Sequence, residues 1–363
     1  MKVLFVLENY YPNIGGVEKL FKTLAESLPP KGYSVSVLTR KSEKDLPEHE
    51  VINGVNIYRI ETFNRLFFSL FSIPKALKLA KEADIIHTSS YSAALPARIV
   101  AKLSGTPSLI TFHEVWDKLW YKLPFTSYLL KRAYRIYERS ILKLKFSEFV
   151  AVSESTASAL KKAGVKQSIS TIYNGINYDD YRKEWKKPEE FSFCYLGRLG
   201  ISKGLEMLVP AAINFIKLHP EVKFKLISPS HPISIYNYIV NEFDKAGLSN
   251  NLIHYESPRP EKLQEILFSS SCIVIPSQSE GFCFVAAEAV ALGVPILSNL
   301  NTALKEVVGG KHILIEPLNT NGVINALNEA YESNFQEIIV KEYHLETSVD
   351  SYLKLYDRLI LSS

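Results

Sequence analysis

Residues 272–297 have the sequence CIVIPSQSEGFCFVAAEAVALGVPIL, which predicts two strands joined by a helix. The segment 272–277 is a short apolar run that ends in Pro and Ser, as a buried parallel strand does. The segment 281–293 has a helical composition and ends at a glycine, and 295–299 is again apolar. This order predicts a βαβ unit with parallel strands.

The same alternation extends in both directions along the chain. In the first half, helical patterns separate apolar runs at 2–7, 34–40, 55–60, 84–89, 107–113 and 148–153. After KKPEEF (186–191), whose polarity and proline suit an interdomain linker, the alternation restarts at 191–197. At roughly 100–200 residues per domain, this length favours two domains. We predict an α/β protein of two Rossmann-like domains, 1–185 and 186–345, facing a central cleft beyond the carboxyl ends of their strands.

Positive charge is concentrated in the first half of the chain. Residues 1–180 hold 25 Lys and Arg against 17 Asp and Glu, whereas the rest holds 17 against 21. This asymmetry indicates an anionic partner for the first domain, unless it is random surface charge. Membrane lipid, a phosphorylated acceptor and nucleic acid are the candidates. No RNA- or DNA-binding motif is present, so we expect no nucleic acid.

Residues 116–146 combine basic and aromatic side chains, a mixture that suits an anionic membrane interface. The stretch RLFFSLFSIPKALK (65–78) adds apolar residues beside lysines. The alternative is a helix that packs its apolar face on the domain and exposes its charge, and both interpretations remain open. On the first, charge reversal at Lys131, Arg132 and Arg135 abolishes binding to anionic liposomes.

The cysteines and the N-terminal segment indicate the cellular compartment of the protein. Cys194, Cys272 and Cys283 lack CxxC spacing and lie in apolar segments, which predicts buried free thiols in a reducing compartment. The N-terminal apolar run is too short for a signal peptide, and no apolar stretch reaches the length of a membrane span. We expect a cytoplasmic protein, with the inner face of the membrane as a peripheral site.

Two glutamates follow the strand 272–277. Glu280 lies at the carboxyl edge of the predicted sheet, and the amides of 281–284 open the next helix. A helix N-terminus offers N–H donors and a positive dipole end to an anion such as a diphosphate. Glu288 lies about two turns further, near the same helical face. We interpret the pair as a site for sugar and ribose hydroxyls; the alternative is a first-turn acid and a solvated helix residue.

The loop YLGRLGISKG (195–204) follows the first strand of the second domain. Arg198 and Lys203 flank a glycine-rich turn in this loop. An arginine, a lysine and exposed amides would hold a diphosphate and stabilise it as it leaves. Basic glycine-rich loops are common, so this loop indicates a diphosphate site strongly only together with the glutamate pair.

Three residues of the first domain are candidates for the same site. Gly15 and Gly16 follow the first strand and permit a tight turn close to a ligand, although GxGxxG is absent and a plain structural turn is the alternative. His113 follows the strand 107–113 and could bond a sugar hydroxyl or transfer a proton, whereas a structural role is the alternative. His87 also lies near the end of a predicted strand, but it is a weaker candidate for the site than His113.

The chain lacks the usual motifs of a metal site. There is no DxD pair, no HExxH and no Cys/His cluster, and the adjacent Asp179 and Asp180 have poor geometry for a metal. We therefore expect a metal-independent reaction without a cofactor, in which cations and amides neutralise phosphates.

Together these motifs resemble the retaining glycosyltransferases of family 4, also called glycosyl transferases group 1, which have the GT-B fold. The resemblance rests on SEGF followed by EA at Glu280 and Glu288, GVPIL after them, the GRL…KG loop at 197–204, the early GG pair and the strand before His113. The motifs VAVSES (150–155) and YNGIN (173–177) also match, so the resemblance covers nearly the whole chain.

The resemblance implies a role for each residue. It implies that Arg198 and Lys203 bind the donor diphosphate, that Glu288 binds the ribose, and that Glu280 contacts the transferred sugar. The amides of Phe282, Cys283 and Phe284 would lie near phosphate or sugar. Gly16, with Gly15 beside it, would approach the phosphate from the first domain, and His113 would lie near the transferred sugar.

The resemblance also implies the activity and the domain roles. A hexose would pass with retention from a UDP- or GDP-linked donor, bound by the second domain, to a glycan or lipid-linked acceptor, bound by the first. The last helix, 346–363, would cross back to the first domain. Cys283 departs from the family, which usually has glycine there, and so puts the details of donor binding in doubt. The alternatives are a nucleotide-sugar epimerase of the same fold and a non-catalytic glycan- or nucleotide-sugar-binding protein.

Overall fold

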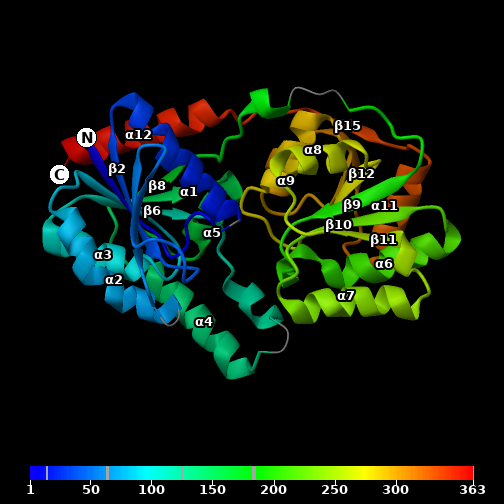
Figure 1. Cartoon of the computed structure of the whole chain (residues 1–363), viewed down its shortest axis with the longest axis horizontal. Coiled ribbons are helices and arrows are strands. Elements are labelled where there is room, and N and C mark those ends of the chain that lie inside the picture. Colours follow the sequence, from blue (N-terminus) through cyan, green and yellow to red (C-terminus); the bar gives the residue numbers. More distant parts are fainter. Residues whose placement is uncertain (14, 63–64, 124–125, 182–184, 363) are drawn as a thin grey trace. The chain divides into compact units, whose positions relative to one another are not determined.

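The computed structural model describes residues 1–13, 15–62, 65–123, 126–181 and 185–362, which form two compact units (Figure 1). Unit 1 is Met1–Gly175 together with His344–Ser363, and unit 2 is Ile176–Tyr343. The division after Gly175 is earlier than the boundary expected at residue 185. The segment expected as a linker lies in unit 2, where the Lys187 ammonium donates to the Ser333 hydroxyl (2.6 Å).

Unit 1 contains an eight-stranded sheet within its described residues, in the order β3-β4-β2-β1-β5-β6-β7-β8. The strands are β1 (Lys2–Val6), β2 (Ser34–Arg40), β3 (His49–Ile52), β4 (Val55–Ile60), β5 (Ile85–Ser89), β6 (Ser108–Phe112), β7 (Glu148–Ala151) and β8 (Ile169–Thr171). Only β3 pairs antiparallel, with β4. Asn53 and Gly54 form their turn with φ of 49° and 79°, which matches a type I′ hairpin.

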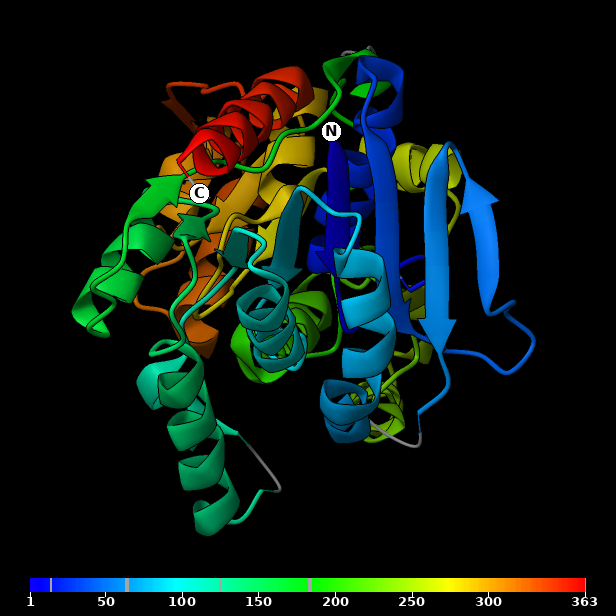
Figure 2. The ribbon, with the colours of Figure 1, turned by 90° about the vertical axis from the view of Figure 1, so that its left-hand side faces the viewer.

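Helices cover both faces of this sheet (Figures 1 and 2). They are α1 (Gly16–Ser27), η1 (Pro29–Lys31), α2 (Arg65–Ala80), α3 (Ala94–Ser104), η2 (Asp117–Lys122), α4 (Tyr128–Ile141), α5 (Glu154–Lys162) and α12 (Leu345–Leu361). Side chains alternate along each strand. Leu4 and Ile86 therefore join a core with Phe68 of α2 and Ala97 of α3. No helix among the described residues is long and apolar enough to cross a membrane.

The C-terminal helix α12 packs on the other face of the same sheet. Its Tyr356 hydroxyl lies 2.7 Å from Nδ1 of His87 on β5, and Nε2 of His87 lies 2.8 Å from the Thr111 hydroxyl on β6. Tyr352 of α12 is also fully buried and lies 3.3 Å from Thr111 Oγ1. His87 is completely buried and both its ring nitrogens have partners, so its role is to bind α12 to the sheet.

The burial of His87 should make the stability of unit 1 sensitive to acid. Burial, followed by the nearby His113, lowers the pKa of His87 to about 3 from 6.5. Between these values the unfolded chain binds a proton that the folded chain excludes, so stability present above pH 6.5 is lost as the pH falls toward 3. We expect His87 to change the free energy of unfolding by up to about 1.4 kcal/mol per pH unit in this range. Denaturant unfolding of wild type and His87→Gln across this pH range measures this contribution. If the stability of both proteins changes with pH in parallel, folding does not lower the pKa of His87.

Unit 2 contains a seven-stranded sheet within its described residues, in the order β11-β10-β9-β12-β13-β14-β15. The strands are β9 (Ser192–Leu196), β10 (Lys223–Ile227), β11 (Leu252–Tyr255), β12 (Cys272–Ile275), β13 (Ile296–Ser298), β14 (Gly310–Leu314) and β15 (Gln336–Ile338). Only β15 is antiparallel to its neighbour. The helices are η3 (Tyr178–Tyr181), η4 (Ile201–Lys203), α6 (Leu205–Leu218), α7 (Ile233–Lys245), η5 (Ser249–Asn251), α8 (Pro260–Phe268), α9 (Phe284–Leu292), α10 (Leu304–Val307) and α11 (Thr320–Tyr331).

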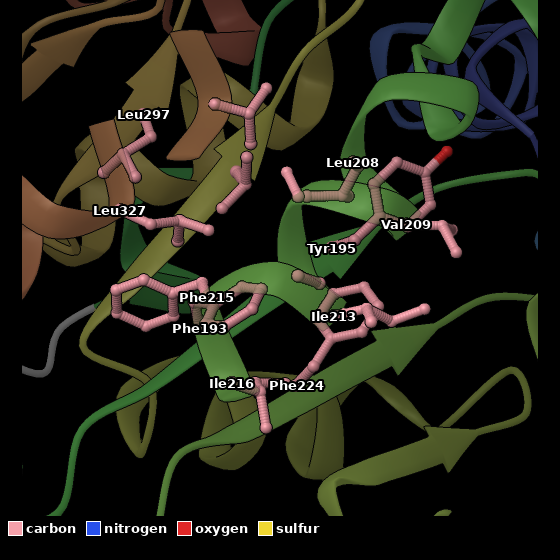
Figure 3. Packing of buried hydrophobic residues seen from close by; sticks show 14 of the residues in the cluster. Phe193, Tyr195, Leu208, Val209, Ile213, Phe215, Ile216, Phe224, Leu297 and Leu327 are labelled. Carbon is pink, nitrogen blue, oxygen red and sulfur yellow. The ribbon is translucent and has the colours of Figure 1, made fainter. Parts of the chain in front are cut away.

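The core of unit 2 lies between one face of this sheet and the helices α6, α7 and α11 (Figure 3). Phe193 of β9 and Phe224 of β10 stack with ring centroids 5.0 Å apart, and Phe215 of α6 meets Phe193 edge to face. Leu327 of α11 completes this layer (Figure 3). The apolar runs of strands and helices thus specify the layers, as the sequence predicts.

In each sheet there is one point from which successive strands are added first toward one edge and then toward the other. In unit 2 this point lies between β9 and β12, and in unit 1 between β1 and β5. Open parallel sheets bind ligands beyond the carboxyl ends of the strands at such a switch point. The loops after β1 and β5 in unit 1, with the loop after the next strand β6 beside them, and the loops after β9 and β12 in unit 2 are therefore the places for a site within each unit.

Candidate active site

Lys203 and Glu280 meet at the switch point of unit 2. The Lys203 ammonium, at the end of η4, lies 2.7 Å from Oε1 of Glu280 in the loop after β12. The Ser277 hydroxyl donates to the same oxygen at 2.7 Å. Glu280 is 8% exposed, so its carboxylate is held by two donors in a largely dry place. The arrangement places one cation and one carboxylate where a ligand would reach both.

Gly204 permits this approach of η4 to the loop after β12. Its φ is 71°, in the left-handed region, and a Cβ there would collide with the carbonyl oxygen of Pro276. Only glycine therefore lets the loop that carries Lys203 pack directly on the end of β12.

Two polar residues after β13 hold the same loop, and the sequence interpretation missed both. The Asn299 side-chain amide donates to the Ser277 carbonyl (2.7 Å), and the Glu280 N–H donates to the Thr302 hydroxyl (2.9 Å). The run NLNT (299–302) follows β13 at the same edge of the sheet, and this position could have indicated a role for it. These bonds fix the backbone that presents Glu280.

The chain turns sharply between Glu280 and the helix α9. Cys283 precedes the helix with φ of 73°, and α9 begins at Phe284. Residues 281–283 thus lie before the helix, and the expectation that their amides open it is wrong. Glu280 and Glu288 also do not share a helical face, because the left-handed residue breaks the helix between them. The rings of Phe282 and Phe284 meet edge to face at 5.3 Å across this turn.

Glu288 lies on α9 and is 7% exposed. It forms a side-chain hydrogen bond with Tyr181 of η3, a residue that the sequence interpretation did not single out. Burial and then the charge of Glu288 raise the pKa of Tyr181, so this phenol stays protonated and donates. A buried carboxylate requires such a donor, and a ribose hydroxyl could take the place of the phenol.

Arg198 follows β9 at the same edge of the sheet, and its side chain is exposed. Its carbonyl oxygen accepts a hydrogen bond from the buried Tyr195 hydroxyl (2.8 Å). The backbone at Arg198 is thus fixed, while its exposed side chain is long enough to reach an anion at this edge of the sheet. Among the described residues, no group of three or more His, Cys, Asp or Glu could hold a metal ion.

The candidates of unit 1 lie at the carboxyl edge of its own sheet. Gly15 is the residue before α1 and Gly16 is its first residue, and Gly15 has φ of −179°. This extended conformation is open to any residue, so the expected glycine-specific turn is not what Gly15 provides. His113 follows β6, and its ring meets Phe21 of α1 edge to face at 6.2 Å. The first helix and His113 are therefore neighbours, and the hydroxyl of Thr156 anchors the His113 carbonyl (3.2 Å).

Comparisons with known proteins identify the family of this chain. The family model for Glycosyltransferase Family 4 matches residues 14–180, and that for Glycosyl transferases group 1 matches 177–344. This chain belongs to glycosyltransferase family 4. It is an enzyme that transfers glycosyl groups, and its two sheets with flanking helices form a GT-B fold.

Three relatives of this glycosyltransferase illustrate the match. The GDP-mannose:cellobiosyl-diphosphopolyprenol alpha-mannosyltransferase of Xanthomonas campestris is 24% identical over 83% of this chain and 79% of that protein. One subunit of the human phosphatidylinositol N-acetylglucosaminyltransferase is 22% identical over 98% of this chain and 76% of that protein. The structure of sucrose-phosphate synthase from Thermosynechococcus elongatus matches over 100% of both chains with a TM-score of 0.80 and 18% identity.

Cys283 is where this glycosyltransferase departs from the glycine that the family resemblance predicts. Burial and the charge of Glu280 raise the pKa of the Cys283 thiol well above its usual value, so it stays protonated. A side chain at φ of 73° is strained, and a β-branched one is strained more. We expect Cys283→Val to lower the free energy of unfolding by about 2 kcal/mol and Cys283→Gly to change it by less than about 1 kcal/mol. Denaturant unfolding checks both, and a Val variant as stable as wild type would contradict the left-handed conformation.

Proposed function

We propose that this protein is a retaining, metal-independent hexosyltransferase that uses a UDP- or GDP-linked sugar and acts on a lipid-linked acceptor or glycan. The observation that carries the proposal is the Lys203–Glu280 pair at the switch point of unit 2, beside the turn into α9. A cation that already holds one carboxylate can exchange it for the oxygens of a diphosphate.

In this proposal Lys203 and Arg198 neutralise the diphosphate as it leaves. The bond between the anomeric carbon and the phosphate oxygen breaks, and an acceptor hydroxyl forms the new bond on the same face of the sugar. The acceptor proton passes to the departing phosphate oxygen, so no covalent enzyme intermediate is needed. Positioned cations stabilise the charge that develops on the leaving group.

Two glutamates bind the rest of the donor in this proposal. Glu280 accepts hydrogen bonds from hydroxyls of the transferred sugar, and its fixed loop supplies the orientation. Glu288 accepts from the ribose hydroxyls in place of Tyr181. The backbone amides of Phe282, Cys283 and Phe284 face the phosphates or the sugar. Because the carboxylates are buried, a bound hydroxyl forms a stronger hydrogen bond there than in water.

In this proposal unit 1 binds the acceptor and also supplies contacts to the donor. Its candidates are His113, which would bond a hydroxyl of the transferred sugar, and the start of α1 at Gly15 and Gly16, which would approach the donor phosphate. The names of the Xanthomonas and human relatives point to a diphosphopolyprenol and a phosphatidylinositol as acceptors, and these names support a lipid-linked acceptor. The cysteines are free and buried, which supports a reducing compartment such as the cytoplasm.

A panel of UDP-, GDP- and ADP-sugars tests the proposal. Each sugar is added with EDTA, and both the melting temperature and donor turnover are measured with and without a total lipid extract. We expect one nucleotide class to raise the melting temperature and to be consumed only when the extract is present. The anomeric configuration of the product, read by NMR, should equal that of the donor.

The other outcomes identify the alternatives. Sugar release or epimerisation without any acceptor would favour the epimerase. Stabilisation by a nucleotide sugar with no turnover in any condition would favour a binding protein. A requirement for a divalent metal would contradict metal independence, and an inverted product would contradict retention.

A further inference from the structure

The helix α4 presents apolar side chains to solvent on one of its faces. Leu129 and Ile136 are 76% and 58% exposed. They are seven residues apart, which is close to two turns, so they form one stripe along the helix. The opposite side of the helix packs inward through Glu138 and Ile141. An exposed apolar stripe on a surface helix usually marks an interaction site.

A row of arginines runs beside this stripe. Arg132 and Arg139 are exposed and have the same seven-residue spacing, each three residues after an apolar member of the stripe. Residues three apart are neighbours on a helix surface. The outward side of α4 therefore carries apolar residues next to guanidinium groups, and this is the pattern of a helix that lies in a membrane interface.

The first half of α2 adds apolar surface to unit 1. Phe67, Leu70 and Phe71 are 42%, 62% and 59% exposed, and Lys75 and Lys78 follow them in the same helix. The helix α2 begins after the carboxyl end of β4, and α4 comes after the carboxyl end of β6. Both therefore belong to the carboxyl side of the sheet, and in Figures 1 and 2 both lie toward the lower side of unit 1.

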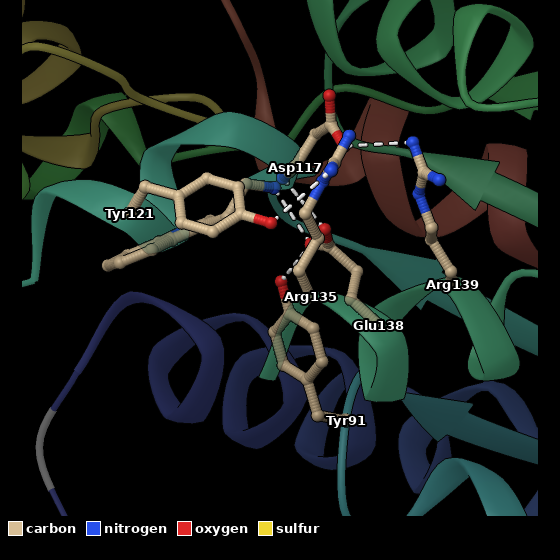
Figure 4. Close-up of polar contacts among 7 residues, drawn as sticks. Tyr91, Asp117, Tyr121, Arg135, Glu138 and Arg139 are labelled. Carbon is tan, nitrogen blue, oxygen red and sulfur yellow. Dashed lines mark hydrogen bonds and ion pairs between the residues drawn. The ribbon is translucent and has the colours of Figure 1, made fainter. Parts of the chain in front are cut away.

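A polar cluster holds α4 in place. The buried Glu138 carboxylate accepts hydrogen bonds from the Trp116 and Asp117 N–H groups (2.8 and 2.7 Å) and from the Tyr91 hydroxyl (2.9 Å). On the surface, Arg135 pairs with Asp117 at 2.7 Å, and Arg139 reaches the same carboxylate at 3.4 Å (Figure 4). The exposed face of α4 thus belongs to a fixed element, connected directly to the segment that follows His113.

We propose that the outward face of α4 and the first half of α2 form a surface that docks on an anionic lipid bilayer. Leu129 and Ile136 enter the interface, while Arg132 and Arg139 contact phosphate headgroups. Both arginines of the exposed row are cationic, which complements an anionic surface. Arg139 also reaches the Asp117 carboxylate, so Arg132 is the arginine that the test changes. The inference deepens the proposed function, because it explains how the enzyme would reach a lipid-linked acceptor.

The structure also selects the variants that test this surface. Lys131 donates to the Tyr121 carbonyl (3.1 Å), and Arg135 pairs with Asp117, so both hold η2 to α4. Reversing their charge, as the sequence alone suggests, would disturb the fold as well as the surface. Arg132→Glu and the double variant Leu129→Ser/Ile136→Ser change only exposed side chains.

Two control variants match these changes elsewhere in unit 1. Leu103 is 65% exposed at the end of α3, and Lys162 is exposed at the end of α5. Both helices return toward the amino ends of the strands, so these residues lie at the side away from the proposed surface. Leu103→Ser removes one exposed leucine, and Lys162→Glu alters the net charge as Arg132→Glu does.

The experiment is co-sedimentation with vesicles of phosphatidylcholine alone or mixed with phosphatidylglycerol, at an ionic strength of about 0.01 M. We expect wild type to bind only the anionic vesicles. Arg132→Glu and Leu129→Ser/Ile136→Ser should each weaken binding about ten-fold or more, whereas both controls stay within about two-fold. No binding by wild type would overturn the proposal, and so would an equal loss in the controls, which would indicate diffuse charge attraction.

Two further measurements distinguish a membrane surface from a dimer contact and from a damaged donor site. Sedimentation velocity of Leu129→Ser/Ile136→Ser shows whether the stripe joins two copies of this chain; a change in oligomeric state without vesicle binding would overturn the proposal. The melting-temperature shift produced by the nucleotide-sugar donor is measured for the same variants. It should equal the wild-type shift, and its absence in wild type would count against the proposed nucleotide-sugar donor and its site while leaving the vesicle result intact.

Discussion

Replacing Lys203 with alanine is expected to lower kcat/KM for the nucleotide-sugar donor about 100- to 1,000-fold. The substitution removes the cation that lies 2.7 Å from Glu280 and that would neutralise the leaving diphosphate. It also leaves the buried Glu280 carboxylate to repel the same phosphates. Steady-state kinetics with the donor identified in the panel measures the effect.

The controls for this prediction separate charge from shape and from folding. Lys203→Arg keeps the positive charge and should retain more activity than the alanine variant. Lys187→Ala removes an exposed lysine of unit 2 that bonds Ser333, and it should leave kcat/KM unchanged. If a folded Lys203→Ala enzyme keeps its kcat/KM within about three-fold, Lys203 does not act on the diphosphate, because losing such a donor costs far more.

Most of the fold follows from the sequence because apolar runs and helical patterns alternate so regularly. The elements that escaped prediction are short or lie at sheet edges. The strand β3 has only four residues, yet Asn53 and Gly54 before β4 are a strong hairpin signal that could have revealed it. The helix α2 spans Arg65–Ala80, whereas the sequence showed only apolar residues beside lysines at 65–78, because exposed apolar residues hide the usual contrast between helix faces.

The sequence predicted those site residues that combine a suitable side chain with a position directly after a strand. Glu280 and Lys203 meet because the carboxyl ends of β9 and β12 are adjacent, and strand adjacency follows from the fold class. The partner Thr302 had only its position after β13 as a signal, whereas Tyr181 comes from a distant segment and no local pattern in the sequence indicates it. The left-handed turn at Cys283 was equally hidden, since cysteine gives no sign of a positive φ.

Replacing Glu138 with glutamine is expected to lower the free energy of unfolding by about 2–3 kcal/mol. Glu138 is 1% exposed, and its two carboxylate oxygens accept from two backbone N–H groups and the Tyr91 hydroxyl. The glutamine amide would present its own N–H groups to one of these donors, and the neutral oxygen would bind the others more weakly. The melting temperature of unit 1 should fall by about 5–10 °C.

The matched control for Glu138 is Glu82→Gln, which removes the same charge from a residue whose side chain is 77% exposed and paired with Lys2. Such surface pairs contribute about 1 kcal/mol at most, so its melting temperature should stay near wild type. Hydrogen exchange distinguishes a local role of Glu138 from a general one: exchange in residues 113–123 should accelerate in Glu138→Gln before the rest of unit 1 changes. Equal protection of this segment in both variants would mean that Glu138 does not hold the segment after His113, and α4 would then owe its position to its apolar contacts and to Lys131 and Arg135.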